Sequence, residues 1–70
     1  MKIDTQKMTD RMDKLGLTET ELAKLYPPNG CSRQFIHQVR LGERGQTFKV
    51  IEKIAALLGF EDPREILMID

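Results

Sequence analysis

With 70 residues, the chain is long enough for one domain and too short for two. It contains one cysteine and one histidine, which excludes an intramolecular disulfide and suggests no metal site. It has no apolar run of transmembrane length, no signal-peptide pattern, no nucleophile–base set and no phosphate-binding glycine loop. We therefore expect a soluble cytoplasmic domain that is not an enzyme and has no cofactor, metal, membrane or small-molecule partner.

The charges are distributed unevenly, although eleven basic and eleven acidic residues cancel over the whole chain. Residues 1–31 are balanced, residues 32–53 carry five basic groups against two acidic ones, and residues 54–70 carry one basic group against four acidic ones. A local excess of positive charge attracts a phosphate backbone even when the whole molecule is neutral. The middle of the chain is therefore the part expected to face a polyanionic partner.

Helical spacing recurs along the chain and alternating hydrophobicity is absent, so we predict an all-α domain with five helices and no strand. The first helix covers about residues 4–15, because Met8, Met12 and Leu15 recur on one face. Gly16 follows it, and glycine adopts the left-handed conformation in which many helices end.

The next two helices begin at recognisable N-caps. Thr18, with Glu21 three residues later, forms the capping-box pattern, and the helix ends near Tyr26 because two prolines follow. Ser32 is the N-cap of the third helix, which stops at Gly42.

The last two helices are delimited in the same way. The fourth begins after Thr47 and is closed by Gly59. Its wide apolar stripe consists of Val50, Ile51, Ile54, Ala55, Leu57 and Leu58. The fifth is short, with Asp62 as N-cap, Pro63 at the first helical position and Glu65 at the capping-box position.

The third helix carries two different faces. At about 100° per residue, Phe35, Ile36 and Val39 form a stripe expected to be buried. The remaining long polar side chains share the outward face: Arg33, Gln34, His37, Gln38 and Arg40. An ordinary solvated helix mixes Glu and Lys, whereas this helix contains no acid at all. Arginine pairs with guanine O6 and N7, and glutamine with adenine N6 and N7, so this composition favours a DNA-contacting face.

The sequence resembles the lambda-repressor-like, Cro/cI-type helix-turn-helix domains of the XRE family over about residues 11–67. The matching marks are LGLT before the second helix, ELA within it, a serine capping the third helix and QFI inside that helix, a glycine after it, and IAALLG in the fourth. The resemblance implies a compact five-helix domain over residues 1–70, with the helix-turn-helix at about residues 18–42. Its third helix would then lie in the major groove of double-stranded DNA.

The resemblance also implies which residues contact DNA. Base contacts are expected from Arg33, Gln34 and Gln38, with His37 adjacent on the same face. By the same resemblance, phosphate contacts are expected from Arg44 and Lys49. Thr18, Ser32 and Arg40 are further candidates for phosphate contacts.

Members of this family usually bind as dimers to two half-sites roughly 34 Å apart. A short final helix cannot bury all of its apolar residues on so small a core. We therefore expect a homodimer contact from Phe60, Ile66, Met68 and Ile69.

Two features depart from the family pattern. Glu19 stands where a glutamine is usual, near the expected DNA surface, where a carboxylate would repel phosphate. Either the second helix sits differently, or Glu19 pairs with a nearby base. The turn at residues 26–32 is also about three residues longer than is usual, with Pro27-Pro28-Asn29-Gly30 at its centre. It is either a tolerated surface insertion or a segment that alters how the third helix is presented.

The leading functional hypothesis is therefore a sequence-specific transcriptional regulator, a Cro-like repressor that binds a palindromic operator as a dimer and excludes polymerase. A second hypothesis is a DNA-binding antitoxin or autoregulatory partner of another protein. A third is a protein-interaction module that has lost DNA binding, which zero net charge and Glu19 would favour.

Overall fold

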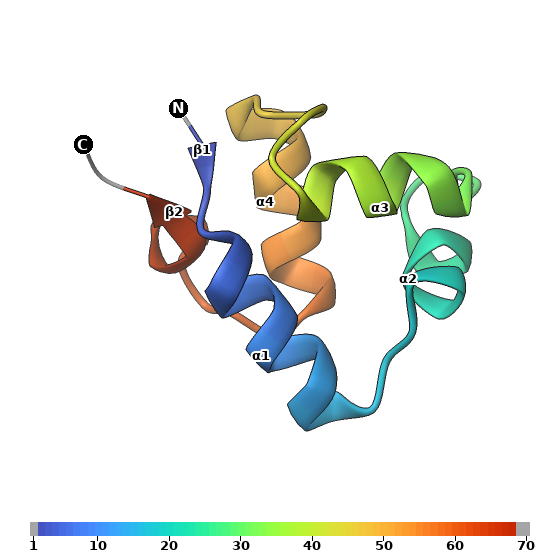
Figure 1. Ribbon diagram of the computed structural model, residues 1–70, viewed down its shortest axis with the longest axis horizontal. Coiled ribbons are helices and arrows are strands. Elements are labelled where there is room, and N and C mark those ends of the chain that lie inside the picture. The colour runs from blue at the N-terminus through green and yellow to red at the C-terminus, as the bar shows by residue number, and fades with distance from the viewer. Residues whose placement is uncertain (1, 69–70) are drawn as a thin grey trace.

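The computed structural model describes residues 2–68, in which four α-helices are flanked by two short strands near the ends of the chain (Figure 1). The elements follow in the order β1 (Lys2–Ile3), α1 (Thr5–Leu15), α2 (Glu19–Leu25), α3 (Arg33–Arg40), α4 (Phe48–Leu57), a 3₁₀ turn η1 (Pro63–Ile66) and β2 (Leu67–Met68). Helix α3 lies across one end of α4 and beside α2, while α1 runs along the other side of α4 (Figure 1).

The helix starts predicted after Thr18, Ser32 and Thr47 are confirmed, and the first helix begins at Thr5, one residue after its predicted start, with Asp4 as its N-cap. The side chains of Asp4, Thr18, Ser32 and Thr47 each accept a hydrogen bond from a backbone N–H in the first turn of the helix that follows. Around Thr18 the capping box is complete, with Glu21 bonded back to the Thr18 backbone N–H. These bonds satisfy backbone donors that have no partner inside the helix, so each of the four helices begins where the local sequence indicates.

One apolar core joins the helices. Its twelve buried side chains are Ile3, Met8, Met12, Leu22, Ala23, Ile36, Val39, Ile51, Ile54, Ala55, Leu58 and Ile66. Met8 and Met12 are thus core residues as their spacing predicts, whereas Leu15 is half exposed. Each helix contributes its predicted apolar face, and the polar faces point outward.

The chain ends differ from the prediction of five helices and no strand. A fifth α-helix is not confirmed: Pro63–Ile66 form a short 3₁₀ helix, with the predicted N-cap Asp62 and the predicted capping box to Glu65. The absence of strands is wrong, because β1 and β2 pair antiparallel with Ile3 opposite Leu67. A strand of two residues is too short to show alternation, and this pair forms only because the fold brings both ends together.

This arrangement corrects part of the predicted homodimer contact. Ile66 is fully buried in the core of the single chain, so its side chain has no surface to offer a second copy. Phe60 is half-buried beneath the guanidinium of Arg11, which lies 4.1 Å from the ring centroid. Met68 is about half exposed, and Ile69 lies outside the described residues.

The loop between α3 and α4 is held against the core by a glycine. Gly45 has φ +65°, and a Cβ at this position would lie 2.8 Å from Val39 Cγ2 and 3.1 Å from Phe35 Cζ. The backbone therefore approaches α3 more closely than any other residue type allows.

Gly45→Ala should consequently reduce the free energy of unfolding by more than the strain of a left-handed backbone alone would. Gly16 also has positive φ, but no atom lies within 4 Å of the position that a Cβ would take there. Alanine at Gly16 should therefore cost about 1 kcal/mol. At Gly45 overpacking should add roughly 1–3 kcal/mol to that. Urea denaturation of the two variants measures the difference, and equal losses would show that the loop yields without cost.

Candidate nucleic-acid interface

The outward face of α3 is set by what the helix buries. Ile36 and Val39 are fully buried, and Phe35 is partly buried and packed against the core. Ser32 caps the helix by accepting a hydrogen bond from the Phe35 backbone N–H at 3.1 Å. Since the apolar stripe is held inward, the polar residues between it must face outward.

The side chains expected to contact bases are displayed on this face to different degrees. The side chain of Arg33 is 68% exposed and that of His37 is 53% exposed. Gln34 is exposed as well, whereas Gln38 is half-buried. The structure thus brings the four predicted residues together on one helix face, with Gln38 the most withdrawn.

Glu19, the first residue of α2, lies against this face. It places a carboxylate beside a helix that contains no acidic residue of its own. Its Oε2 is 2.8 Å from His37 Nδ1 and 3.2 Å from Arg40 Nη1, and its Oε1 is 3.5 Å from Arg33 Nη1. Its side chain is only 12% exposed. Within the chain, the Glu19 carboxylate is therefore paired with three side chains of α3.

The ionisation of Glu19 responds to opposing influences. Burial alone would raise the pKa of its carboxyl group, but the hydrogen bond from His37, the charge that His37 carries when protonated, and the charge and hydrogen bond of Arg40 outweigh burial and hold the pKa below its ordinary value. The carboxylate is also in the first turn of α2, where the helix dipole favours negative charge. Glu19 is therefore an ion that joins α2 to α3.

Arg40 differs from the expectation of a free phosphate-contacting residue. Its Nε donates to the hydroxyl of Thr9 on α1 at 3.2 Å while its Nη1 donates to Glu19. The side chain is 29% exposed. Arg40 therefore links α3 to both α1 and α2, and its guanidinium is already engaged within the molecule.

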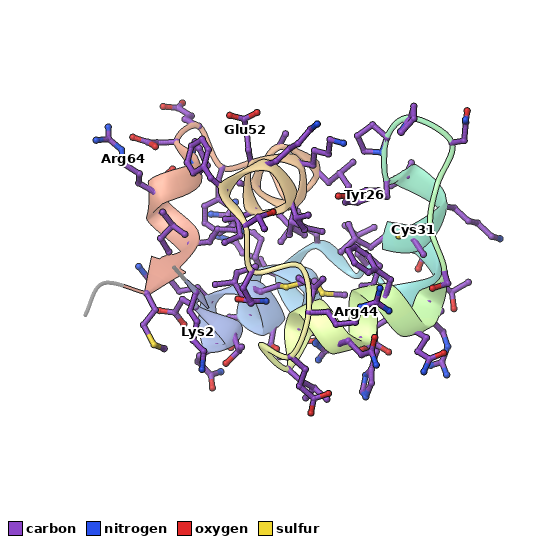
Figure 2. The ribbon with its side chains drawn as sticks, turned by 90° about the horizontal axis from the view of Figure 1, so that it is seen from above. Lys2, Tyr26, Cys31, Arg44, Glu52 and Arg64 are labelled. Carbon is purple, nitrogen blue, oxygen red and sulfur yellow. The ribbon has the colours of Figure 1, made fainter. Side chains whose placement is uncertain are left out.

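Arg44 and Gln38 form a second polar pair beside α3. Arg44 Nη1 donates to Gln38 Oε1 at 3.1 Å, and its guanidinium lies over the Phe35 ring at 5.4 Å from the centroid. Figure 2 shows Arg44 close to α3. A glutamine whose carbonyl is held in this way keeps its amide N–H groups oriented as donors.

The remaining phosphate candidates occupy helix starts. The hydroxyls of Thr18 and Ser32 act as N-caps, accepting from the backbone N–H of Glu21 and Phe35. Lys49 is the second residue of α4 and is exposed. These three residues place polar groups at the beginnings of three helices, where backbone N–H groups are also directed outward.

Gln46 is a structural residue that sequence reasoning did not identify. Its Oε1 accepts from the Ile3 backbone N–H at 2.8 Å, and its Nε2 donates to the Arg44 carbonyl at 2.7 Å. One side chain therefore ties the loop after α3 to strand β1. Because Ile3 and Gln46 lie far apart in sequence, no local pattern could have indicated the contact.

The lengthened turn folds back onto α2. The Cys31 backbone N–H donates to the Ala23 carbonyl at 2.9 Å, and the Gly30 N–H donates to the Tyr26 carbonyl. Pro27 and the two residues after it are exposed. The turn therefore closes on itself, and these backbone groups are used within the helix pair.

Other kinds of site find little support in residues 2–68. No group of three metal-ligating side chains occurs in that range, and none of its helices has the length and apolar character needed to cross a bilayer. An open hollow is lined by Lys7, Asp10, Arg11, Lys14 and Phe60. Lys7 there donates to the carbonyl of Glu65 in η1, and Arg11 donates to the carbonyl of Leu58, the C-cap of α4, so both residues connect α1 to neighbouring elements.

Comparison with protein-family models, curated proteins and solved structures gave no match. The functional argument therefore depends on the chain's own residues and their geometry.

Acid should destabilise the protein in part through Glu19. The pKa of Glu19 in the folded protein lies below the ordinary value of 4.5. The ionised carboxylate therefore adds to the free energy of unfolding at a pH above 4.5, and this contribution is lost as the pH falls through the folded-state pKa. Glu19→Gln, which cannot ionise, should therefore lose less unfolding free energy between about pH 5 and pH 3. Urea denaturation across this range measures the slope.

Glu52→Gln is the matched control, because Glu52 is an exposed acid on α4, on the opposite side of the molecule from α3 in Figure 2. It should keep the wild-type dependence on pH. If Glu19→Gln also kept the wild-type dependence on pH, the ionisation of Glu19 would contribute nothing to stability.

Proposed function

We propose that this protein is a sequence-specific, double-stranded DNA-binding transcriptional regulator that inserts α3 into the major groove. In this proposal α2 and α3 act as the two helices of a lambda-repressor-like helix-turn-helix. The first would cross the DNA backbone and the second would contact base edges.

One observation carries the proposal, namely the outward face of α3. Arg33, Gln34 and His37 are exposed there, Gln38 lies beside them, and no acid belongs to the helix itself. Together they supply the donors and acceptors that discriminate base pairs in the major groove. The burial of Ile36 and Val39 holds the helix to the core, while Arg33 and His37 also contact Glu19 of α2.

Phosphate contacts are assigned to groups around this face. Arg44 and Lys49 are cations in the loop and at the start of α4, and Thr18 and Ser32 mark the starts of α2 and α3. Contacts to phosphate position a protein on DNA without selecting sequence. Arg40 is assigned a structural role, because its hydrogen bonds to Thr9 and Glu19 connect α3 to α1 and α2.

Regulation would follow from occupancy of the operator by the protein. A homodimer on a palindromic operator excludes polymerase from an overlapping promoter and requires no chemistry. The exposed Met68 and half-buried Phe60 remain the described residues proposed for the dimer contact.

The deciding experiment is a selection from random duplex DNA at moderate salt, followed by sequencing of the bound pool. We expect two inverted half-sites about one helical turn, roughly 34 Å, apart. A single half-site would remove the dimer and keep the DNA function. No enrichment would favour the protein-interaction alternative, which the neutralisation of basic groups by Glu19 supports.

Salt dependence separates these two functions independently of sequence. Binding through several phosphates should weaken with a log–log slope of about −0.9 for each phosphate neutralised. Lys49→Ala, which removes an exposed cation at the start of α4, should weaken binding to all duplexes alike and reduce this slope by about 1. A complex that is insensitive to salt would contradict a DNA-binding face.

Gln34→Ala should reduce affinity for the selected site by about 1–3 kcal/mol and relax the preference at one base pair. Binding titrations with the selected site and with its single-base variants measure both effects. Gln6→Ala, which removes the same side chain from an exposed position on α1, is the control and should leave both unchanged. If Gln34→Ala behaved like this control, the assigned docking of α3 would be wrong.

A further inference from the structure

His37 makes a directed contact through one of its two ring nitrogens. Nδ1 lies 2.8 Å from Glu19 Oε2, whose side chain is 12% exposed, while the histidine side chain is 53% exposed. The two nitrogens of an imidazole point away from each other. With Nδ1 turned to the buried carboxylate, Nε2 is therefore directed toward the exposed side of the ring.

The direction of this hydrogen bond follows from the state of the carboxylate. The pKa of Glu19 lies below its ordinary value, and an ionised carboxylate only accepts hydrogen bonds. Nδ1 must then carry the hydrogen. In a neutral ring that leaves Nε2 without one, so Nε2 is an acceptor.

The carboxylate is itself held from several sides, which makes the orientation of the ring definite. Arg40 donates to the same Oε2 at 3.2 Å and is tied to Thr9 on α1, and Arg33 lies 3.5 Å from Oε1. Glu19 also follows the capping residue Thr18 at the start of α2. Three helices therefore determine where the acceptor for Nδ1 lies.

We propose that Glu19 is a positioning residue that holds His37 as the Nδ1–H tautomer and presents Nε2 outward as a hydrogen-bond acceptor for an exocyclic amino group of a base. The last part of this statement rests on the proposed DNA-binding function, whereas the tautomer does not.

The selectivity that follows is specific. In the major groove, adenine N6 and cytosine N4 are donors, whereas guanine N7 and O6 and thymine O4 are acceptors. A neutral Nε2 acceptor therefore favours adenine or cytosine at the base that His37 meets and disfavours guanine and thymine. Without Glu19, the ring can carry its hydrogen on either nitrogen, and the preference is lost.

A purely structural ion pair would behave differently. If Glu19 served only to join Arg33 and Arg40 to α2, the His37 tautomer would follow the intrinsic preference of histidine, which in water favours Nε2–H. The tautomer of His37 therefore distinguishes the two roles, because a purely structural ion pair would not change it.

Nitrogen-15 NMR of the full chain without DNA measures it. His37 is the sole histidine of the sequence, so one pair of ring nitrogens is observed without assignment ambiguity. On the alkaline plateau of a pH titration, where the ring is neutral, we expect the shift of a protonated Nδ1 and an unprotonated Nε2. A predominant Nε2–H tautomer would overturn the proposal.

Two variants and a matched control extend the test. Glu19→Ala should shift the ring toward the Nε2–H tautomer, and Glu52→Ala, an equal change of charge on α4, should leave it unchanged. Glu19→Gln, which preserves the shape of the side chain, provides a second variant if Glu19→Ala does not fold. Its amide can donate as well as accept, so it should give a mixture of tautomers. An unchanged Nδ1–H tautomer in the folded Glu19→Ala protein would overturn the role of Glu19.

Selection from random duplexes on the alkaline plateau, where the ring is neutral and Nε2 is an acceptor, then tests the base preference. Glu19→Ala should lose a discrimination on the order of tenfold for adenine or cytosine at one position and keep the preferences due to Gln34. Equal preference in wild type and variant would overturn the role of Glu19 in base selection. If wild type selects no motif, the DNA-binding function and the base-selecting role fail together. The NMR result would then still decide whether Glu19 sets the tautomer.

Discussion

The orientation of α3 depends on the complete burial of Ile36 and Val39. These two side chains lie on one face of the helix, and both belong to the twelve-residue core, from which water is excluded. The opposite face is then necessarily the one that carries Arg33, Gln34 and His37. A constraint of apolar packing thus decides which polar groups the molecule displays.

Polar contacts then decide how those groups are held. Glu19 and Arg40 connect the start of α2, the middle of α1 and the outer face of α3 in one network of short contacts. A carboxylate in this place lowers the positive charge of the face, but it also limits the orientations of the side chains bonded to it. Charge and geometry therefore have opposite consequences for a polyanionic partner, since attraction becomes weaker while the groups that contact it become better ordered.

The two ends of the chain complete the domain by a separate mechanism. Strands β1 and β2 pair, Ile3 and Ile66 enter the core, and Gln46 bonds the backbone of β1 to the loop after α3. A chain of 70 residues has few apolar residues to spare. Using both ends to cover α1 and α4 gives a small core additional side chains, and it connects the terminal strand to the loop that carries Arg44.

The sequence by itself determined the four α-helices, the N-caps of α2, α3 and α4 and the division of α3 into a buried and an exposed face, because capping bonds and helical periodicity involve residues within four positions of one another. The tertiary structure alone decided the pairing of the chain ends, the burial of Ile66, and the choice of Arg33, His37 and Arg40 as partners of Glu19. Each of these contacts joins segments that are distant in sequence. Their formation depends on packing that no local pattern encodes.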